Sequence, residues 1–146
     1  MEIDPEELAV QYKSLNILQT AFASGQIIFA VIAYVLTRDD QRPADWSDPQ
    51  VIVAAIFIAV LVPLSFFLYK RNLDKVKAED NAANKIALYR GAFILRTAML
   101  EGCTLYAIIV ILITHCLTYS ILVAIPLMIF LNSWITLNKM KRDLEI

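Results

Sequence analysis

Charged residues are scarce in this chain: Asp, Glu, Lys and Arg make up 18% of it, while 59% is hydrophobic. A typical soluble domain is about 25% charged and about 45–50% apolar. The net charge of −1 gives no reason to expect a polyanionic partner, so we expect no nucleic acid. Because the apolar excess is gathered in long runs, the composition indicates an integral membrane protein, with the lipid bilayer as its first partner.

Cysteine and histidine are too few for the common stabilising and metal centres. The two cysteines, Cys103 and Cys116, fit neither a disulfide framework nor a zinc site, and His115 is the single histidine. Since no nucleophile–base pair, phosphate-binding loop or metal cluster is recognisable, we expect no catalytic residues, no cofactor and no metal. The N-terminus lacks the basic region of a cleavable signal peptide, so we expect the first apolar segment to remain in the mature protein.

Four apolar segments predict an all-α membrane protein with four transmembrane helices. Each has about 19–24 residues, and a hydrocarbon layer of about 30 Å needs about 20 at 1.5 Å per residue. The segments are Asn16–Thr37, Val51–Tyr69, Gly91–Thr114 and Tyr119–Leu137. Asp4-Pro5 and Asp48-Pro49 are helix-start patterns, and Pro63 and Pro126 fall where membrane helices tolerate a kink. The charged stretch Lys70–Lys85 predicts helix ends and a turn in water, or else a flexible linker.

An internal repeat relates the two halves of the chain. Tyr12–Thr37 and Tyr89–Thr114 share nine identical residues at a constant offset of 77. We therefore predict one membrane domain, residues 1–146, that contains the repeats 12–72 and 89–140 as two tandem, same-orientation helical hairpins joined by a cytoplasmic connection, residues 70–88. The repeats differ where Gln19 is matched by Arg96 and Ser24 by Glu101.

The basic residues predict the orientation. Ten lie in the N-terminal arm, the middle connection and the tail, against two in the first outer loop. Lys and Arg are enriched on the cytoplasmic side, so both termini are expected in the cytoplasm of a bacterial inner membrane. On this topology Cys116 should lie at the outer face, while Cys103 should be buried. Several Trp and Tyr residues are expected to anchor the helices at the interfaces.

Glu101 is the acidic residue inside a predicted span. At 100° per residue, Thr97, Glu101 and Thr104 fall on one stripe of the third helix. An ionisable residue at this depth normally faces protein or water, and Ser24 and Asn132 are candidate partners on other helices. Two interpretations stay open: a protonated carboxyl group that hydrogen-bonds between helices, or a site that binds a proton or a cation. Arg96 is expected at the cytoplasmic interface.

Small residues spaced four apart form a notch in each repeat. The pairs are Ala21 with Gly25 and Ala98 with Gly102. Such notches let membrane helices approach closely. The first and third helices are expected to meet through them, or each to meet a neighbouring molecule. Partners of this kind would make the protein a homo-oligomer or part of a larger membrane complex.

The third helix resembles the carboxylate-bearing helix of rotary-ATPase proteolipids, the c-ring subunits. Leu95–Gly102, LRTAMLEG, is similar to the approach to the ion site in some F-type subunits, and this register puts the ion-binding position at Ala107. In a second register, Glu101 followed by Tyr106 is similar to the ion site itself. Ring subunits have a glycine-rich inner helix, whereas Val51–Tyr69 contains no glycine. The pattern also resembles small bacterial four-helix inner-membrane proteins, a likeness that implies no activity.

Two functions follow as hypotheses. The first is a non-enzymatic structural or accessory subunit of a membrane assembly, in which Glu101 is a polar contact. The alternative is a proteolipid-like or small transporter protein that binds a proton or a cation at Glu101.

Overall fold

The computed structural model describes residues 5–145, and every regular element in that range is helical. The elements are α1 (Pro5–Thr37), α2 (Pro49–Lys77), α3 (Ala82–Thr114), the 3-10 turn η1 (Leu117–Tyr119), α4 (Ser120–Asn132) and α5 (Leu137–Leu144). α1, α2 and α3 are each long and apolar enough to cross a membrane. A fourth span is present if η1 to α4 is counted together with α5, from which it is bent by 73°.

Local capping explains where α2 and α3 begin. The Asp48 carboxylate accepts the Gln50 amide at 2.8 Å, and Pro49 occupies the first turn. The Asn81 side chain accepts the amides of Ala83 and Asn84 at 3.0 and 3.2 Å. α2 continues to Lys77 and α3 starts at Ala82, so the prediction of helix ends and a turn in the charged stretch is confirmed. The other start pattern includes Asp4, which lies outside the described residues.

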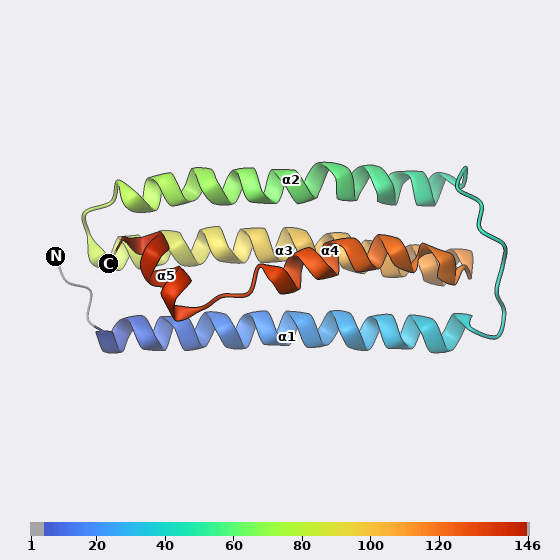
Figure 1. Ribbon diagram of the computed structural model, residues 1–146, viewed down its shortest axis with the longest axis horizontal. Helices are drawn as coiled ribbons and strands as arrows, with labels where there is room; N and C mark the ends of the chain where they lie inside the picture. The colour runs from blue at the N-terminus through green and yellow to red at the C-terminus, as the bar shows by residue number, and fades with distance from the viewer. Residues whose placement is uncertain (1–4, 146) are drawn as a thin grey trace.

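α3 is the central helix of the bundle. It packs against α1, α2 and α4, whereas α1 and α2 lie on opposite sides of it and make at most marginal contact with each other (Figure 1). The apolar stretch of α3 is 44% buried, against 22% for those of α1 and α2. α1 and α2 are therefore consecutive and antiparallel helices, but they do not pack against each other as a hairpin. Both described ends of the chain lie at the same end of the bundle.

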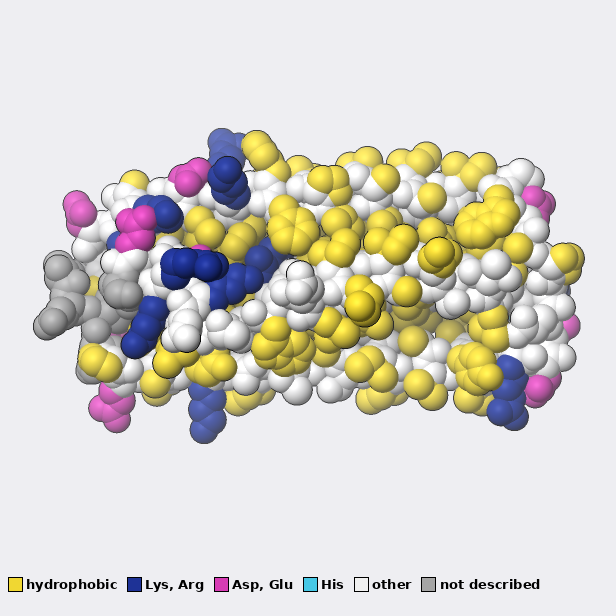
Figure 2. Space-filling model, viewed as in Figure 1, with side chains coloured by type: hydrophobic (Ala, Val, Ile, Leu, Met, Phe, Trp, Pro, Cys, Tyr) yellow, Lys and Arg dark blue, Asp and Glu magenta, His cyan; other side chains and the backbone are white. Residues whose placement is uncertain are grey.

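Large apolar side chains cover the outer surface. Hydrophobic residues dominate the face in Figure 2, while Lys and Arg gather mainly at the end that carries α5. Ile28, Val53 and Met128 are examples, with exposed fractions of 58%, 49% and 66%. Exposed apolar area costs about 25 cal/mol per Å² in water. This cost is absent in the hydrocarbon layer of a membrane, so the apolar surface is the kind expected of a membrane protein.

The fourth helix differs from the prediction, which had one continuous helix over Tyr119–Leu137. α4 stops at Asn132, although Pro126 inside it causes no break. The Ser133 hydroxyl donates to the Ile129 carbonyl at 2.7 Å, and the Thr136 hydroxyl accepts the Lys139 amide at 3.2 Å, which caps α5. Side chains that bond to nearby backbone compete with helix continuation in this way.

The tail after the break is part of the core. α5 is short and amphipathic, and its Met140 and Leu144 are 0% exposed. Both belong to a buried cluster with Leu15, Tyr89 and Phe93. The sequence had indicated only a polar tail here.

Candidate functional site

Glu101 lies on α3 with its side chain half-buried. Neither a hydrogen bond nor an ion pair joins it to another residue in the described range 5–145. Thr97 and Thr104 are buried beside it, but their hydroxyls donate within α3, to the Phe93 carbonyl at 2.8 Å and the Leu100 carbonyl at 3.1 Å. Ser24 and Asn132 are exposed. The five predicted polar residues therefore do not assemble into one hydrogen-bonded site within the chain.

The tyrosine that follows Glu101 in one proteolipid register points elsewhere. The Tyr106 hydroxyl donates to Gln50 Oε1 at 3.4 Å, and its ring centroid lies 5.5 Å from that of Phe57. Ala107, the ion position in the other register, is completely buried in the core.

The small-residue notches do not form the α1–α3 interface, so that expectation is wrong. Ala21 and Ala98 are exposed. A side-chain carbon added at Gly25 or Gly102 would meet no atom within 4 Å. α1 instead buries the face that carries Gln19 and Ala23. Because successive residues are about 100° apart, Ala21 and Gly25 lie on a different face of α1. Contact between the notches and a neighbouring molecule stays a prediction.

The most connected polar site is the break between α4 and α5, which sequence reasoning missed. Gln19 Oε1 accepts the Ile135 amide at 2.9 Å, and Arg96 Nη2 donates to the Ser133 carbonyl at 3.1 Å. The Trp134 indole also donates to Asn16 Oδ1 at 2.9 Å. Backbone that leaves a helix at membrane depth is tolerated where protein satisfies its polar groups. α1 and α3 perform that role from two sides.

Gln19 and Arg96 occupy equivalent positions in the internal repeat. The two positions diverged in chemistry, one to an acceptor that binds an amide and the other to a donor that binds a carbonyl. The sequence carried a signal, since this pair is one of the two differences that place a charged residue in the second copy within its apolar segment. It could not show the target, because the break itself was not predicted.

The Arg96 side chain is buried inside the bundle and is not exposed at its surface. It is 4% exposed, and its guanidinium carbon lies 4.0 Å from the centroid of the Tyr69 ring. The rings of Phe93 and Phe66 lie at 5.7 and 6.0 Å. Aromatic faces attract a cation, so the three rings partly replace its lost hydration. Among the described residues no carboxylate lies within 4.0 Å of Arg96, and its Nε has no hydrogen-bond partner.

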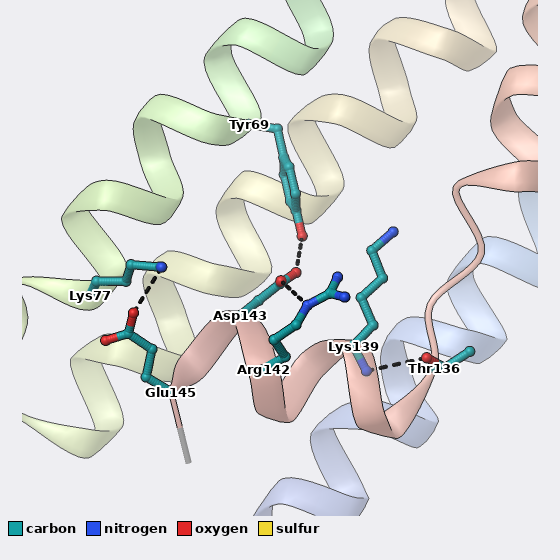
Figure 3. Close-up of polar contacts among 7 residues, drawn as sticks. All are labelled: Tyr69, Lys77, Thr136, Lys139, Arg142, Asp143 and Glu145. Carbon is teal, nitrogen blue, oxygen red and sulfur yellow. Dashed lines mark hydrogen bonds and ion pairs between the residues drawn. The ribbon is translucent and has the colours of Figure 1, made fainter.

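A second polar group connects α5 to α2. The Tyr69 hydroxyl donates to Asp143 Oδ2 at 2.9 Å, and Arg142 Nε lies 3.7 Å from Asp143 Oδ1 (Figure 3). At the end of α5, Lys77 Nζ lies 2.8 Å from Glu145 Oε1. Tyr69 was expected to be an interfacial anchor, but it is 7% exposed and holds α5 against the bundle.

The end of the bundle opposite α5 is held together by Tyr119. Its hydroxyl donates to the Asp45 carbonyl and accepts the Asp45 amide, each at 2.7 Å. The ring meets Trp46 edge-on at 5.2 Å. His115 ends α3 in the left-handed region with φ 53°, and its carbonyl accepts the Arg42 amide at 2.9 Å. Cys116 is 2% exposed beneath this loop, so the loop shields its thiol, and Cys103 is buried as expected.

The chemistry available to the described residues is limited. No group of three or more His, Cys, Asp and Glu side chains within residues 5–145 could hold a metal ion. The polar side chains hold backbone and fasten helices to one another. Comparisons of the chain with protein-family models, with curated proteins and with solved structures found no match.

Proposed function

We propose that the chain is a non-enzymatic integral membrane protein that serves as a structural or accessory subunit of a membrane assembly. It would span a bacterial inner membrane four times, with both termini in the cytoplasm. The fourth span would be the segment Tyr119–Leu137, which includes α4 and the break after it. The observation that carries the proposal is the unpartnered Glu101 beside an open notch, formed by Ala98 and Gly102 on the same helix.

An unpartnered carboxyl group in a span is unfavourable for an isolated chain. A charged side chain at the centre of a membrane helix costs about 2.5–3.5 kcal/mol on insertion scales, and such residues normally face protein or water. Glu101 is half-buried, and residues 5–145 supply it with no hydrogen-bond partner. A second molecule packed against this face would shield the carboxyl group and could supply a donor.

The notch next to Glu101 is suited to such a contact. Since a carbon at Gly102 would meet no atom within 4 Å of its own chain, the surface there is open to another helix. Small-xxx-small surfaces let helix backbones approach closely in lipid, where association depends on van der Waals packing. The same arrangement recurs on α1 at Ala21 and Gly25. The internal repeat would thus offer two related contact surfaces.

The orientation rests on charge. Lys and Arg collect at the end that carries α5 and both described chain ends, while the opposite end has Arg38 and Arg42 among several aspartates. The positive-inside rule favours a cytoplasmic location for the basic end. Both described chain ends lie at the same end of the bundle, which supports an even number of crossings.

The test is the oligomeric state of the purified protein in mild detergent, measured by light scattering. Gly102→Leu should convert the wild-type oligomer to monomer, because leucine would fill the notch. The substitution should not unfold the chain, since a Cβ atom at this position has open space within 4 Å and leucine raises helix propensity by about 1 kcal/mol. Ala59→Leu, at an exposed alanine of α2, is the matched control and should stay oligomeric. A monomeric wild type, or an unchanged Gly102→Leu oligomer, would refute the proposal.

The alternative function is a proton or cation site at Glu101. It is favoured by one observation: the carboxyl group is unpaired and reaches the surface of the bundle. Because the hydroxyls of Thr97 and Thr104 donate within α3, further ligands would come from a second chain. A hydrophobic carbodiimide should then modify Glu101 in a pH-dependent way, with protection by Na⁺ or Li⁺. If modification of Glu101 depends on neither pH nor cations, the proton or cation site is wrong and the structural role remains.

A further inference from the structure

Arg96 is a buried cation whose charge is not balanced by its surroundings. The hydrogen bond to Ser133 is the one bond that the described residues give it, and a guanidinium has five N–H donors. Burial of an uncompensated charge is costly, so buried charges are normally paired. The aromatic rings around Arg96 attract the cation but do not neutralise it.

A second cation, Lys139, lies one helical turn before Asp143 on α5. Asp143 accepts the hydroxyl of Tyr69, and Arg96 lies against the ring of the same Tyr69. Lys139 is half-buried on α5, and its amine is joined to none of the side chains drawn with it in Figure 3. Burial, and after it the nearby Arg96 guanidinium, lower the pKa of the Lys139 amine. The two positive groups therefore repel each other across the junction of α3 and α5, which favours an anion between or beside them.

Asp143, the acidic residue within α5, already has partners. Asp143 accepts the Tyr69 hydroxyl at 2.9 Å and lies 3.7 Å from Arg142. Asp143 opposes the shift of Lys139, but its effect is smaller than that of Arg96. If the positive charge of Arg142 balances the negative charge of Asp143, the charges of Arg96 and Lys139 remain without a carboxylate.

The position of the pair suits a lipid headgroup. The guanidinium of Arg96 lies against Tyr69, the residue before Lys70 and Arg71, where the apolar part of α2 ends. Figure 2 shows basic side chains over α5 beside extensive hydrophobic surface. Basic pockets between membrane helices on the cytoplasmic side bind anionic headgroups, and Arg and Lys both bind phosphate oxygens well.

We propose that Arg96 and Lys139 form a binding site for the phosphate group of an anionic phospholipid at the junction of α3 and α5. The Arg96 guanidinium and the Lys139 amine donate to phosphate oxygens, and the acyl chains lie on the adjacent apolar surface. The lipid would also stabilise the break between α4 and α5, since Arg96 holds it. The site needs no second protein molecule, so it does not depend on the oligomer proposed above.

The experiment uses the full-length protein in a zwitterionic detergent. Phosphatidylglycerol, phosphatidylcholine or inorganic phosphate is titrated, and binding is followed by native mass spectrometry and by the melting temperature. Phosphatidylglycerol should bind and raise the melting temperature, while phosphatidylcholine should not. If inorganic phosphate at millimolar concentration stabilises the protein as well as phosphatidylglycerol does, the site takes free phosphate and the lipid assignment is wrong.

Two lysines on the same helix provide the matched variants. Lys139→Gln should weaken phosphatidylglycerol binding about tenfold, as expected for loss of one charge-assisted hydrogen bond. Lys141→Gln, at an exposed position of α5, should bind within about twofold of the wild type. Without lipid, Lys139→Gln should melt no lower than the wild type, because it removes repulsion from Arg96. Equal binding by wild type and Lys139→Gln, or equal loss in both variants, would overturn the proposal.

Discussion

Two buried glutamines on α1 should respond in opposite ways to the same substitution. Gln19 Oε1 accepts the Ile135 amide at 2.9 Å, whereas both polar atoms of the Gln26 side chain are buried without a hydrogen-bond partner. The two residues are 1% and 0% exposed, so a leucine at either position would be fully buried. Gln19→Leu leaves the Ile135 amide without an acceptor, while Gln26→Leu removes two unpaired polar atoms.

The expected magnitudes follow from the cost of an unpaired buried polar group, about 1–3 kcal/mol. Gln19→Leu should lower the free energy of unfolding by about that amount, and Gln26→Leu should raise it by about 1 kcal/mol or more. For a chain of this size, 1 kcal/mol moves the melting temperature by about 2–4 °C. Melting temperatures can be measured from the loss of near-UV circular dichroism on heating in one mild detergent. Gln19→Leu should melt below the wild type, and Gln26→Leu should melt above it.

Hydrogen exchange tests where the effect of Gln19→Leu is located. The amide of Ile135 should exchange about 5- to 150-fold faster, which corresponds to about 1–3 kcal/mol. The amide of Asp45, bonded to the Tyr119 hydroxyl at the other end of the bundle, should be unchanged. Unaltered exchange at Ile135, or a Gln26→Leu variant that melts as low as Gln19→Leu, would refute the role assigned to these glutamines.

The remaining predictions concern the two ends of the bundle. Cys116 is 2% exposed, so an impermeant maleimide should label it slowly on intact cells, whereas Ser47→Cys in the exposed outer loop should react quickly. Labelling of Ser47→Cys only after permeabilisation would reverse the proposed orientation. At the basic end, the hydrogen bond from Lys77 holds the pKa of the Glu145 carboxyl below its ordinary value. The stabilisation is present above the ordinary pKa and is lost as the pH falls through the lowered one. The melting temperatures of wild type and Glu145→Gln should therefore converge on acidification, and a gap that persists at low pH would contradict the pairing.

The helix limits of the first three helices were predictable because their signals are local. Asp48 and Pro49 mark the start of α2 within two residues of sequence, and the charged stretch between α2 and α3 contains neither glycine nor proline. Capping hydrogen bonds join residues two or three positions apart. Such contacts can be inferred from the sequence without knowing the fold.

The end of α4 was not predictable in the same way. Tyr119–Leu137 has the length and apolar composition of one continuous span, and its proline does not interrupt it. The break depends on Gln19 and Arg96, which lie 116 and 37 residues from their backbone partners. Without those partners, the amide and the carbonyl at the break would be buried without hydrogen bonds, which would favour a continuous helix.

The notches show a related limit of periodicity. The spacing of Ala98 and Gly102 correctly places them on one face of α3, since 100° per residue fixes the angle between them. It does not determine which face of α3 meets α1. That choice depends on the combined packing of α1, α2 and α4 around one helix.

By itself, the sequence indicated a membrane protein built of long apolar helices, because hydropathy and capping are local signals; it also predicted an internal repeat that differs at Gln19 and Arg96 and at Ser24 and Glu101. Only the tertiary structure decided that α3 lies at the centre, that the last helix breaks after Asn132, and that Arg96 is buried without a carboxylate. Those features arise from contacts between distant segments, whose free energies depend on which surfaces are brought together. Glu101 belongs to both groups: its depth follows from the sequence, and its lack of a partner among the described residues follows from the packing.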